Sequence, residues 1–148
     1  MNRVLIDTNV FIRFLLQTLD NDTDALVRDY STQVYIPSTS VQEFIHLVQT
    51  GRIKTKTKQI EKKSVFELME EDFHVEVLYV TRQHLEEFER LPLVPNHNDP
   101  NDRLIIAQAI SNRLELVSTD TMFVHYRKYG LELIQAKHTA KKKGKVKG

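Results

Sequence analysis

Short apolar runs alternate along this chain with longer segments in which apolar residues recur every three or four positions. The short runs predict strands at Val4–Asp7, Val34–Ile36, His74–Val80, Leu114–Val117 and Leu131–Ile134. The longer segments predict helices at Val10–Leu16, Asp24–Tyr30, Ser40 to just before Gly51, Ser64–Glu71, Arg82–Leu91, Leu104–Ile110 and Met122–Tyr129. Because strands and helices take turns, we expect an α/β fold with a central, mostly parallel sheet of four to five strands and helices on both faces.

Residues at the ends of these segments predict where several helices begin and end. Thr81 is expected to cap the helix that follows it, and Gly130 is expected to end another. The helix at Leu104–Ile110 is apolar nearly all round, which predicts a central position covered on several sides. Leu85 and Phe88 are expected on one apolar helical face.

The length of 148 residues fits one domain, which we expect over residues 1–136, followed by a basic, disordered tail at 137–148. The chain has no cysteine, which excludes disulfides, thiolate zinc sites and a cysteine nucleophile. No apolar run approaches the ~18 residues of a membrane span, and the N-terminus lacks a secretory signal pattern. These features predict a cytoplasmic protein.

The net charge of +1 hides an uneven distribution of charged residues. Two segments, 52–63 and 137–148, hold many of the lysines and arginines, which leaves an acidic remainder. The basic segments could hold a polyanion while the acidic part holds a cation. A solvated loop and a frayed terminus are the alternative, which for the tail alone is the favoured interpretation.

Four acidic residues stand where the predicted strands give way to helices: Asp7, Glu43, Asp102 and Asp120. In a doubly wound sheet, ligands bind beyond the carboxyl ends of the strands, where the strand order reverses. Four carboxylates gathered there would repel one another without a cation, and hard oxygen ligands favour Mg²⁺ or Mn²⁺. Such ions activate water and stabilise a leaving oxygen, which suits phosphodiester hydrolysis.

Each acid also has a purely structural interpretation. Asp7 and Asp120 could cap the helices that follow them, and Ser40-x-x-Glu43 has the spacing of a capping box. Asp99-Pro-Asn-Asp102 has an N-cap, a proline at the first helical position and an acid at the positive end of the helix dipole. The functional interpretation depends on all four acids meeting at one edge of one sheet.

These motifs together resemble the PIN-domain ribonucleases, over roughly residues 3–134. The similar features are Asp7-Thr-Asn after the first strand, Glu43 after Ser-Val-Gln, Asp99-Pro-Asn-Asp102-Arg-Leu-Ile-Ile-Ala-Gln-Ala, and Ser-Thr-Asp120. The long motif at 99–109 is most similar to the VapC-type toxins of type II toxin–antitoxin pairs. Asn101 departs from that branch, which often has an aromatic residue there.

The resemblance implies a PIN-like three-layer α/β/α fold and a Mg²⁺-dependent endoribonuclease, with Mn²⁺ as a substitute ion. It implies an RNA substrate, a cognate antitoxin partner and a homodimer. The implied metal-binding and catalytic residues are Asp7, Glu43, Asp102 and Asp120. The implied supporting residues are Asp99, Thr8, Asn9, Thr119 and Arg103, and Arg103 could equally form a structural ion pair. The residues that could guide the RNA backbone are Arg52, Lys54, Lys56 and Lys58.

Other function classes remain open on the sequence alone. A catalytically silent PIN-like module would bind RNA or protein without cutting, and a PIN nuclease could process RNA without being a toxin. A receiver-like Mg²⁺ domain ranks lower, because it should have a late lysine where Thr119-Asp120 stands. Glu43-x-x-His46 has di-iron spacing but occurs once, where a bundle needs two such motifs. His97, close to Asp99, could touch substrate.

Overall fold

The computed structural model describes residues 2–53, 64–137 and 139. The strands are β1 (Arg3–Ile6), β2 (Gln33–Pro37), β3 (Val75–Leu78), β4 (Glu115–Ser118) and β5 (Glu132–Gln135). The helices are α1 (Thr8–Leu15), α2 (Asn21–Arg28), α3 (Ser38–Gln49), α5 (Val65–Glu67), α6 (Arg82–Arg90) and α7 (Pro100–Asn112). A π-helical turn, η1 (Leu68–Asp72), and a 3-10 helix, η2 (Thr121–Tyr129), complete the described elements.

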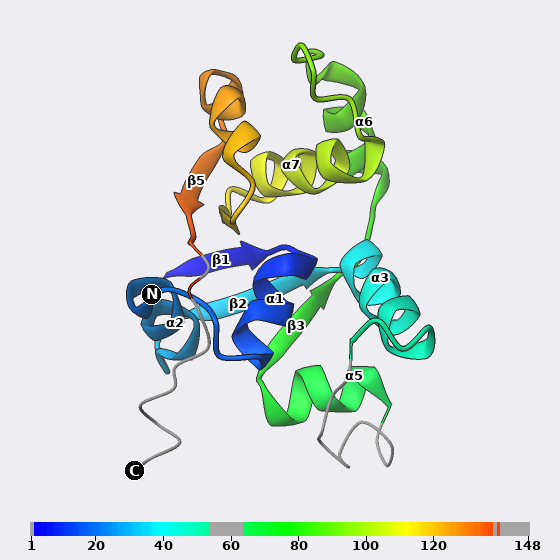
Figure 1. The fold of residues 1–148 in the computed structure, drawn as a ribbon. Coiled ribbons are helices and arrows are strands. Elements are labelled where there is room, and N and C mark those ends of the chain that lie inside the picture. Colours follow the sequence, from blue (N-terminus) through cyan, green and yellow to red (C-terminus); the bar gives the residue numbers. More distant parts are fainter. Residues whose placement is uncertain (1, 54–63, 138, 140–148) are drawn as a thin grey trace.

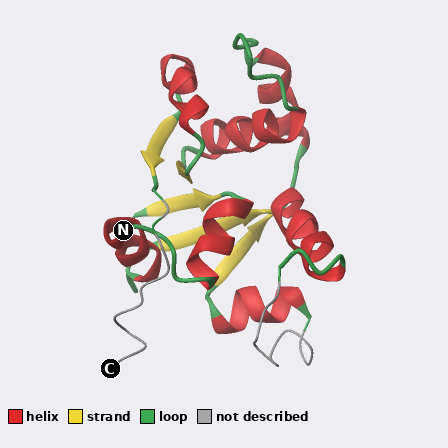
Figure 2. Cartoon of the chain, viewed as in Figure 1, coloured by secondary structure: helices red, strands yellow, loops and turns green. Residues whose placement is uncertain are grey.

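The five strands form one parallel sheet in the order β3-β2-β1-β4-β5. Figure 2 draws strands as yellow arrows and helices in red. β1 therefore has β2 on one side and β4 on the other, and the order of connection reverses between β1 and β4. The register pairs Ile6 of β1 with Val117 of β4, so the two strands end side by side. This confirms the predicted parallel α/β sheet.

Two apolar cores lie on opposite faces of the sheet. Val4 and Ile6 belong to one core, together with apolar residues of α1, α3 and η1. Leu5, which points to the other face because side chains alternate along a strand, joins the core made by α7 and η2. Figure 1 shows the resulting three layers, with α7 on one side of the strands and α1 and α3 on the other. The predicted α/β/α architecture is thus confirmed.

The start of α2 was predicted too late. The helix begins at Asn21 rather than Asp24 and ends at Arg28 rather than Tyr30. Asp20 is the N-cap: its side chain accepts hydrogen bonds from the amide and the hydroxyl of Thr23, at 3.1 and 2.9 Å. The polar residues before Asp24 are therefore the first helical turn.

The start of α3 also differs from the prediction, with a consequence for Glu43. The helix begins at Ser38, and Pro37 holds the N-cap position without a side-chain hydrogen bond. Ser40 lies within the first turn, so the alternative capping box between Ser40 and Glu43 is wrong. The Glu43 carboxylate is exposed instead of being engaged in a cap.

The apolar face predicted for α6 is wrong at Leu85, which is 52% exposed. His84 is the buried residue, and its ring contacts the side chain of Asn112 at the end of α7. Thr81 caps α6 as predicted, and His84 Nδ1 accepts a hydrogen bond from the Thr81 amide in return. This reciprocal cap brings His84, rather than Leu85, toward α7.

The predicted tail at 137–148 lies outside the described residues except at Lys137 and Thr139. Lys137 donates its amide to Asp20, and Thr139 donates its amide to the carbonyl of Thr18. Lys137 and Thr139 are therefore each attached to the domain by a backbone amide. Within the described part of the chain, no helix is both long enough and apolar enough to cross a membrane.

Candidate metal centre

The candidate centre lies where β1 and β4 end next to each other. Asp7 directly follows β1, and Ser118 is the last residue of β4. The Ser118 hydroxyl donates to Asp7 Oδ2 at 2.7 Å and accepts a hydrogen bond from the Asp120 amide at 3.0 Å. One buried serine thus joins the two acidic loops at the point where the strand order reverses, which is the usual ligand position in such sheets.

Asp7 and Asp120 each cap the helix that follows, as their structural interpretation predicted. Asp7 Oδ1 accepts from the Val10 amide at 2.9 Å, and Asp120 Oδ1 accepts from the Met122 amide at 2.8 Å. Capping does not use all the oxygen lone pairs of a carboxylate, which has about four acceptor positions. The caps hold the two carboxylates in place and leave each able to accept a further ligand.

Polar residues beside Asp7 and Asp120 join the same two loops. Asn9 Nδ2 donates to Thr119 Oγ1 at 2.6 Å, which adds a second link between the end of β1 and the end of β4. Thr8 is buried at the first position of α1. These contacts restrict the loops that carry Asp7 and Asp120.

Asp102 reaches the same edge from the first turn of α7. Asp99 is the N-cap of this helix, with Oδ1 accepting from the amides of Asn101 at 2.8 Å and Asp102 at 3.2 Å. Pro100 occupies the first helical position, as predicted. Asp99 therefore fixes the start of the helix on which Asp102 stands.

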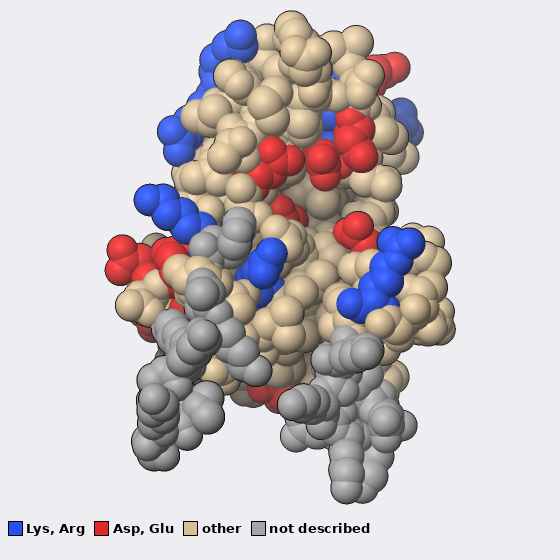
Figure 3. Space-filling model, in the orientation of Figure 1, with Lys and Arg blue, Asp and Glu red and all other residues tan. Residues whose placement is uncertain are grey.

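Glu43 faces Asp102 across a pocket of about 430 Å³ between α3 and the start of α7. Asp99, Asn101 and His46 also line this pocket. Figure 3 shows acidic side chains gathered around a hollow on this face, between the part formed by α7 and the part formed by α1 and α3. Glu43 and Asp102 thus come from opposite layers of the fold to one cleft.

The electrostatics of the centre show that its carboxylates repel one another. Burial raises the pKa of Asp7 to about 6, with Asp102 and Asp120 adding to the rise and the hydrogen bond from Ser118 opposing it. Burial also raises the pKa of Asp102, to which Asp99, Asp120 and Glu43 contribute while His97 opposes. Asp102 therefore interacts with every other predicted acid of the centre.

The tightest cluster of possible metal ligands consists of His97, Asp102 and Asp120. One ligand atom from each lies within 4.8 Å of the others. Asp7 is close enough to repel Asp102 and Asp120, and Glu43 is close enough to repel Asp102, although neither belongs to this tight group. Of the four predicted acids, Asp102 and Asp120 therefore belong to the tight cluster, while Asp7 and Glu43 lie near enough to influence Asp102.

The residues at this centre fit a divalent cation. The fit rests on two observations: the pKa values of Asp7 and Asp102 are raised, first by burial and then by neighbouring carboxylates, and Nε2 of His97 has no hydrogen-bond partner among the described residues. Carboxylate oxygens with one imidazole nitrogen form a donor set suited to Mg²⁺, Mn²⁺ or a related ion.

Arg103 and Arg52 are the predicted basic site residues that the structure describes, and neither belongs to the cluster of possible metal ligands. The Arg103 side chain is buried, donates to the carbonyl of Leu91 at 2.6 Å and lies over the Phe88 ring. Arg103 thereby attaches α7 to the end of α6. Arg52 is exposed just beyond α3, while Lys54, Lys56 and Lys58 lie outside the described residues.

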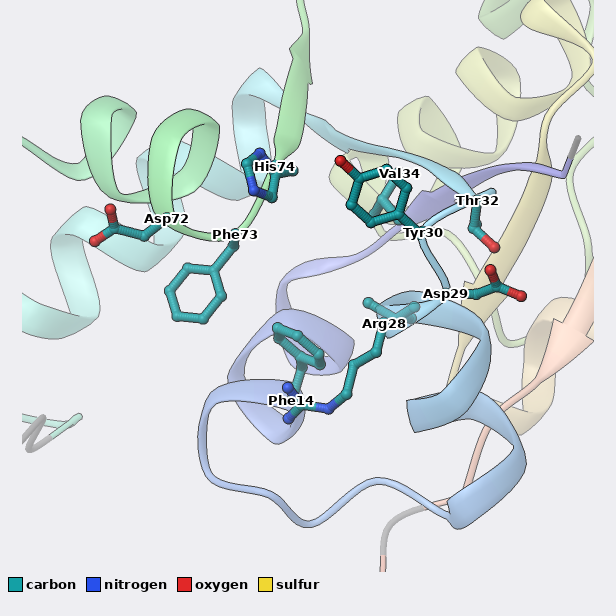
Figure 4. Close-up of a pocket in the computed structure, with 10 residues that line it drawn as sticks. Phe14, Arg28, Asp29, Tyr30, Thr32, Val34, Asp72, Phe73 and His74 are labelled. Carbon is teal, nitrogen blue, oxygen red and sulfur yellow. The ribbon is translucent and has the colours of Figure 1, made fainter.

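A second pocket, of about 420 Å³, is lined by none of the four candidate acids. Phe14, Arg28 and Phe73 are among its lining residues, and the Arg28 guanidinium lies 4.5 Å from the centre of the Phe14 ring (Figure 4). None of the predicted site residues lines this pocket.

The sequence analysis did not predict the contacts that Ser118 and His97 make at the candidate centre. Ser118 appeared only as part of the Ser-Thr-Asp120 motif, and His97 was considered only as a substrate contact. A hydroxyl at the last position of a strand that precedes an acid could have indicated Ser118. Nothing in the loop pattern around His97 predicts that its ring is buried.

Comparison with known proteins agrees with this geometry. The family model described as the PIN domain matches residues 4–129. No curated protein sequence matches the chain.

Several solved structures share the fold at low sequence identity. VapBC2 from Rickettsia felis, bound to a DNA fragment from its promoter, has a chain 17% identical, with a TM-score of 0.63 over 91% of this chain and 99% of that one. FitAcB from Neisseria gonorrhoeae gives 16% identity and a TM-score of 0.59 over 89% and 96% of the chains. VapBC-1 from nontypeable Haemophilus influenzae has a chain that is 17% identical, with a TM-score of 0.58 over 90% of this chain and 97% of that one. These likenesses show the fold.

The raised pKa of Asp7 predicts that the metal-free protein loses stability as the pH rises. The folded state holds the Asp7 proton up to about pH 6, whereas the unfolded state releases it near 3.8. The contribution is present below pH 3.8 and is lost through pH 6, by roughly 3 kcal/mol at about 1.4 kcal/mol per pH unit. Urea unfolding in EDTA, measured between pH 4 and 7.5, tests this.

Asp7→Asn is the matched control for this measurement, because an amide can still accept the Val10 hydrogen bond but does not ionise. The free energy of unfolding of this variant should fall less steeply with pH than that of the wild type. Parallel curves for the two proteins would mean that Asp7 does not carry the buried charge.

Proposed function

The chain belongs to the PIN domain family, and from this premise we propose that it is a Mg²⁺-dependent endoribonuclease, for which Mn²⁺ can substitute. The observation that carries the proposal is the convergence of Asp7, Glu43, Asp102 and Asp120 from four separate segments on the edge where β1 and β4 end. Repulsion among carboxylates that gather around the buried Asp7 lowers stability, and a bound cation would offset that repulsion.

The proposed roles follow from the position of each acid. Asp102 and Asp120 would hold the ion directly, Asp7 would complete the site from the buried side, and Glu43 would complete it from across the cleft. A divalent ion supplies a Lewis acid for the phosphoryl oxygen and lowers the pKa of water at neutral pH. The chain itself orients the carboxylates, through Ser118 and the amides of Val10 and Met122.

RNA is the proposed substrate, and the acidic centre alone would repel it. Arg52 lies just beyond α3, the helix that carries Glu43. Lys54, Lys56 and Lys58 come next in the sequence, outside the described residues. Positive charges there would hold the RNA backbone without reading its sequence.

We further propose that the nuclease is the toxin of a type II toxin–antitoxin pair and acts in the cytoplasm as a homodimer. The support is the fold shared with chains of the VapBC and FitAcB structures, together with the toxin-like motif at 99–109. An antitoxin would then cover the cleft and place a basic side chain among the carboxylates.

Neutralising the central acids should abolish cleavage without unfolding the protein. With Mg²⁺ and labelled total RNA, Asp7→Asn and Asp102→Asn should each lower the cleavage rate at least 100-fold, because each removes a carboxylate from the proposed centre. Asp22→Asn, which changes an exposed acid on α2, should cleave at the wild-type rate. Cleavage by the wild type that persists in EDTA would contradict the metal requirement, and absence of cleavage by metal-loaded protein would favour a silent binding module.

Replacing the basic residues at 52–58 should weaken RNA binding and make the remaining affinity less dependent on salt. In an Asp7→Asn background, changing Arg52, Lys54, Lys56 and Lys58 to alanine should flatten the plot of log K against log salt by about 0.7 for each lost phosphate contact. Arg82→Ala on α6 is the control and should leave the slope unchanged. An unaltered slope in the fourfold variant would assign RNA binding to another surface.

The toxin proposal predicts an effect on bacterial growth. Controlled expression of the wild-type chain alone should stop growth of a bacterial culture, whereas Asp7→Asn expressed to the same level should not. Normal growth with a wild-type protein that cleaves RNA in the test tube would instead indicate a processing nuclease.

A further inference from the structure

His97 is a buried histidine at the edge of the acidic centre. It lies in the loop before α7, is 6% exposed, and packs edge-on against Phe123 and Tyr126 of η2, with ring centres 5.5 and 5.3 Å away. Imidazoles held this firmly have a fixed ring orientation. The position of Nε2 is therefore set by the core of the protein rather than by solvent.

The two ring nitrogens of His97 have different surroundings. Nδ1 lies 2.7 Å from the hydroxyl of Tyr126, and that hydroxyl donates its proton to the carbonyl oxygen of His97 at 3.4 Å. The direction of the shorter contact depends on the tautomer of the ring, and in the tautomer with a proton on Nδ1 the hydroxyl oxygen accepts from Nδ1–H. Nε2 is then the nitrogen that carries the lone pair.

Nε2 faces the acids without a hydrogen-bond partner among the described residues. It lies 3.6 Å from Asp102 Oδ2, which is longer than a hydrogen bond, and it belongs with Asp102 and Asp120 to the cluster that spans 4.8 Å. A buried polar atom with no partner is rare in folded proteins. A nitrogen lone pair directed at two carboxylates is stabilised when a cation lies between them.

We propose that His97 Nε2 is a nitrogen ligand of the divalent ion, completing a His97–Asp102–Asp120 centre. In this proposal Nδ1–H donates to the Tyr126 oxygen at 2.7 Å, a second hydrogen bond of the kind that fixes the tautomer and orientation of metal-bound histidines. The inference rests on the proposed metal-dependent function, and it adds a nitrogen ligand and a preference among divalent metal ions. A centre of carboxylates alone suits Mg²⁺, whereas an imidazole shifts the preference toward Mn²⁺ and later first-row ions.

Pulsed electron paramagnetic resonance of Mn²⁺ bound to the whole wild-type chain tests the ligand directly. A coordinated imidazole should produce ¹⁴N modulation of the Mn²⁺ echo, and His97→Gln should remove it. His125→Gln, which changes an exposed histidine on η2, should keep it. The wild-type spectrum does not depend on whether any variant folds.

Competition between metal ions supplies the second measurement. The His97→Gln variant places an amide oxygen where the nitrogen was, so its affinity for Mn²⁺ should fall on the order of 10-fold while its affinity for Mg²⁺ falls less. The preference for Mn²⁺ over Mg²⁺ should therefore shrink. Circular dichroism confirms that the compared proteins are folded.

Three results would overturn the inference, and they differ in what they mean for the proposed function. Wild-type protein that binds Mn²⁺ without ¹⁴N modulation would leave the carboxylate centre intact but make His97 the ion-pair partner of Asp102. Modulation lost in His46→Gln instead would assign the nitrogen to the other histidine of the cleft. Failure of the folded chain to bind Mn²⁺ at all would overturn the metal-dependent function itself.

Discussion

The parallel pairing of β1 with β4 is the constraint on which the candidate centre depends. It brings Asp7 and Ser118, which are 111 positions apart, within a 2.7 Å hydrogen bond, and Asp120 follows two residues later. The same pairing separates the two layers of helices, because the connections leave β1 and β4 on opposite faces. α7 can then bring Asp102 from one layer while α3 brings Glu43 from the other. The centre is therefore a property of the topology rather than of any single segment.

The carboxylates at this edge of the sheet cap helices and also belong to the candidate metal centre. Asp7, Asp99 and Asp120 each cap a helix, so the interactions that fold the helices also position the carboxylates. The buried carboxylate of Asp7 opposes folding when it is ionised without a cation, since burial and neighbouring acids raise its pKa. A bound ion would remove this penalty, which couples the stability of the domain to the occupancy of its proposed site.

Local periodicity and cap residues predicted most of this fold and the candidate acids, because strands, helices and N-caps are specified by residues close in sequence. The strand order was beyond such patterns, since it depends on pairing between distant segments. Leu85 was misassigned because the reciprocal cap between Thr81 and His84 brings the histidine to α7. His97 was not recognised as part of the acidic cluster because its burial comes from Phe123 and Tyr126, in a different element.

The central claim is that the acids at the ends of β1 and β4 form a binding site for a divalent cation. Thermal unfolding of the wild type at pH 7.5 across a Mg²⁺ titration tests this most directly. Saturation to 100 times the dissociation constant should stabilise the fold by about 2.7 kcal/mol, which raises the midpoint by several degrees, and Asp102→Asn should remove most of the rise. A midpoint that is independent of Mg²⁺ and Mn²⁺ in the wild type would contradict the claim.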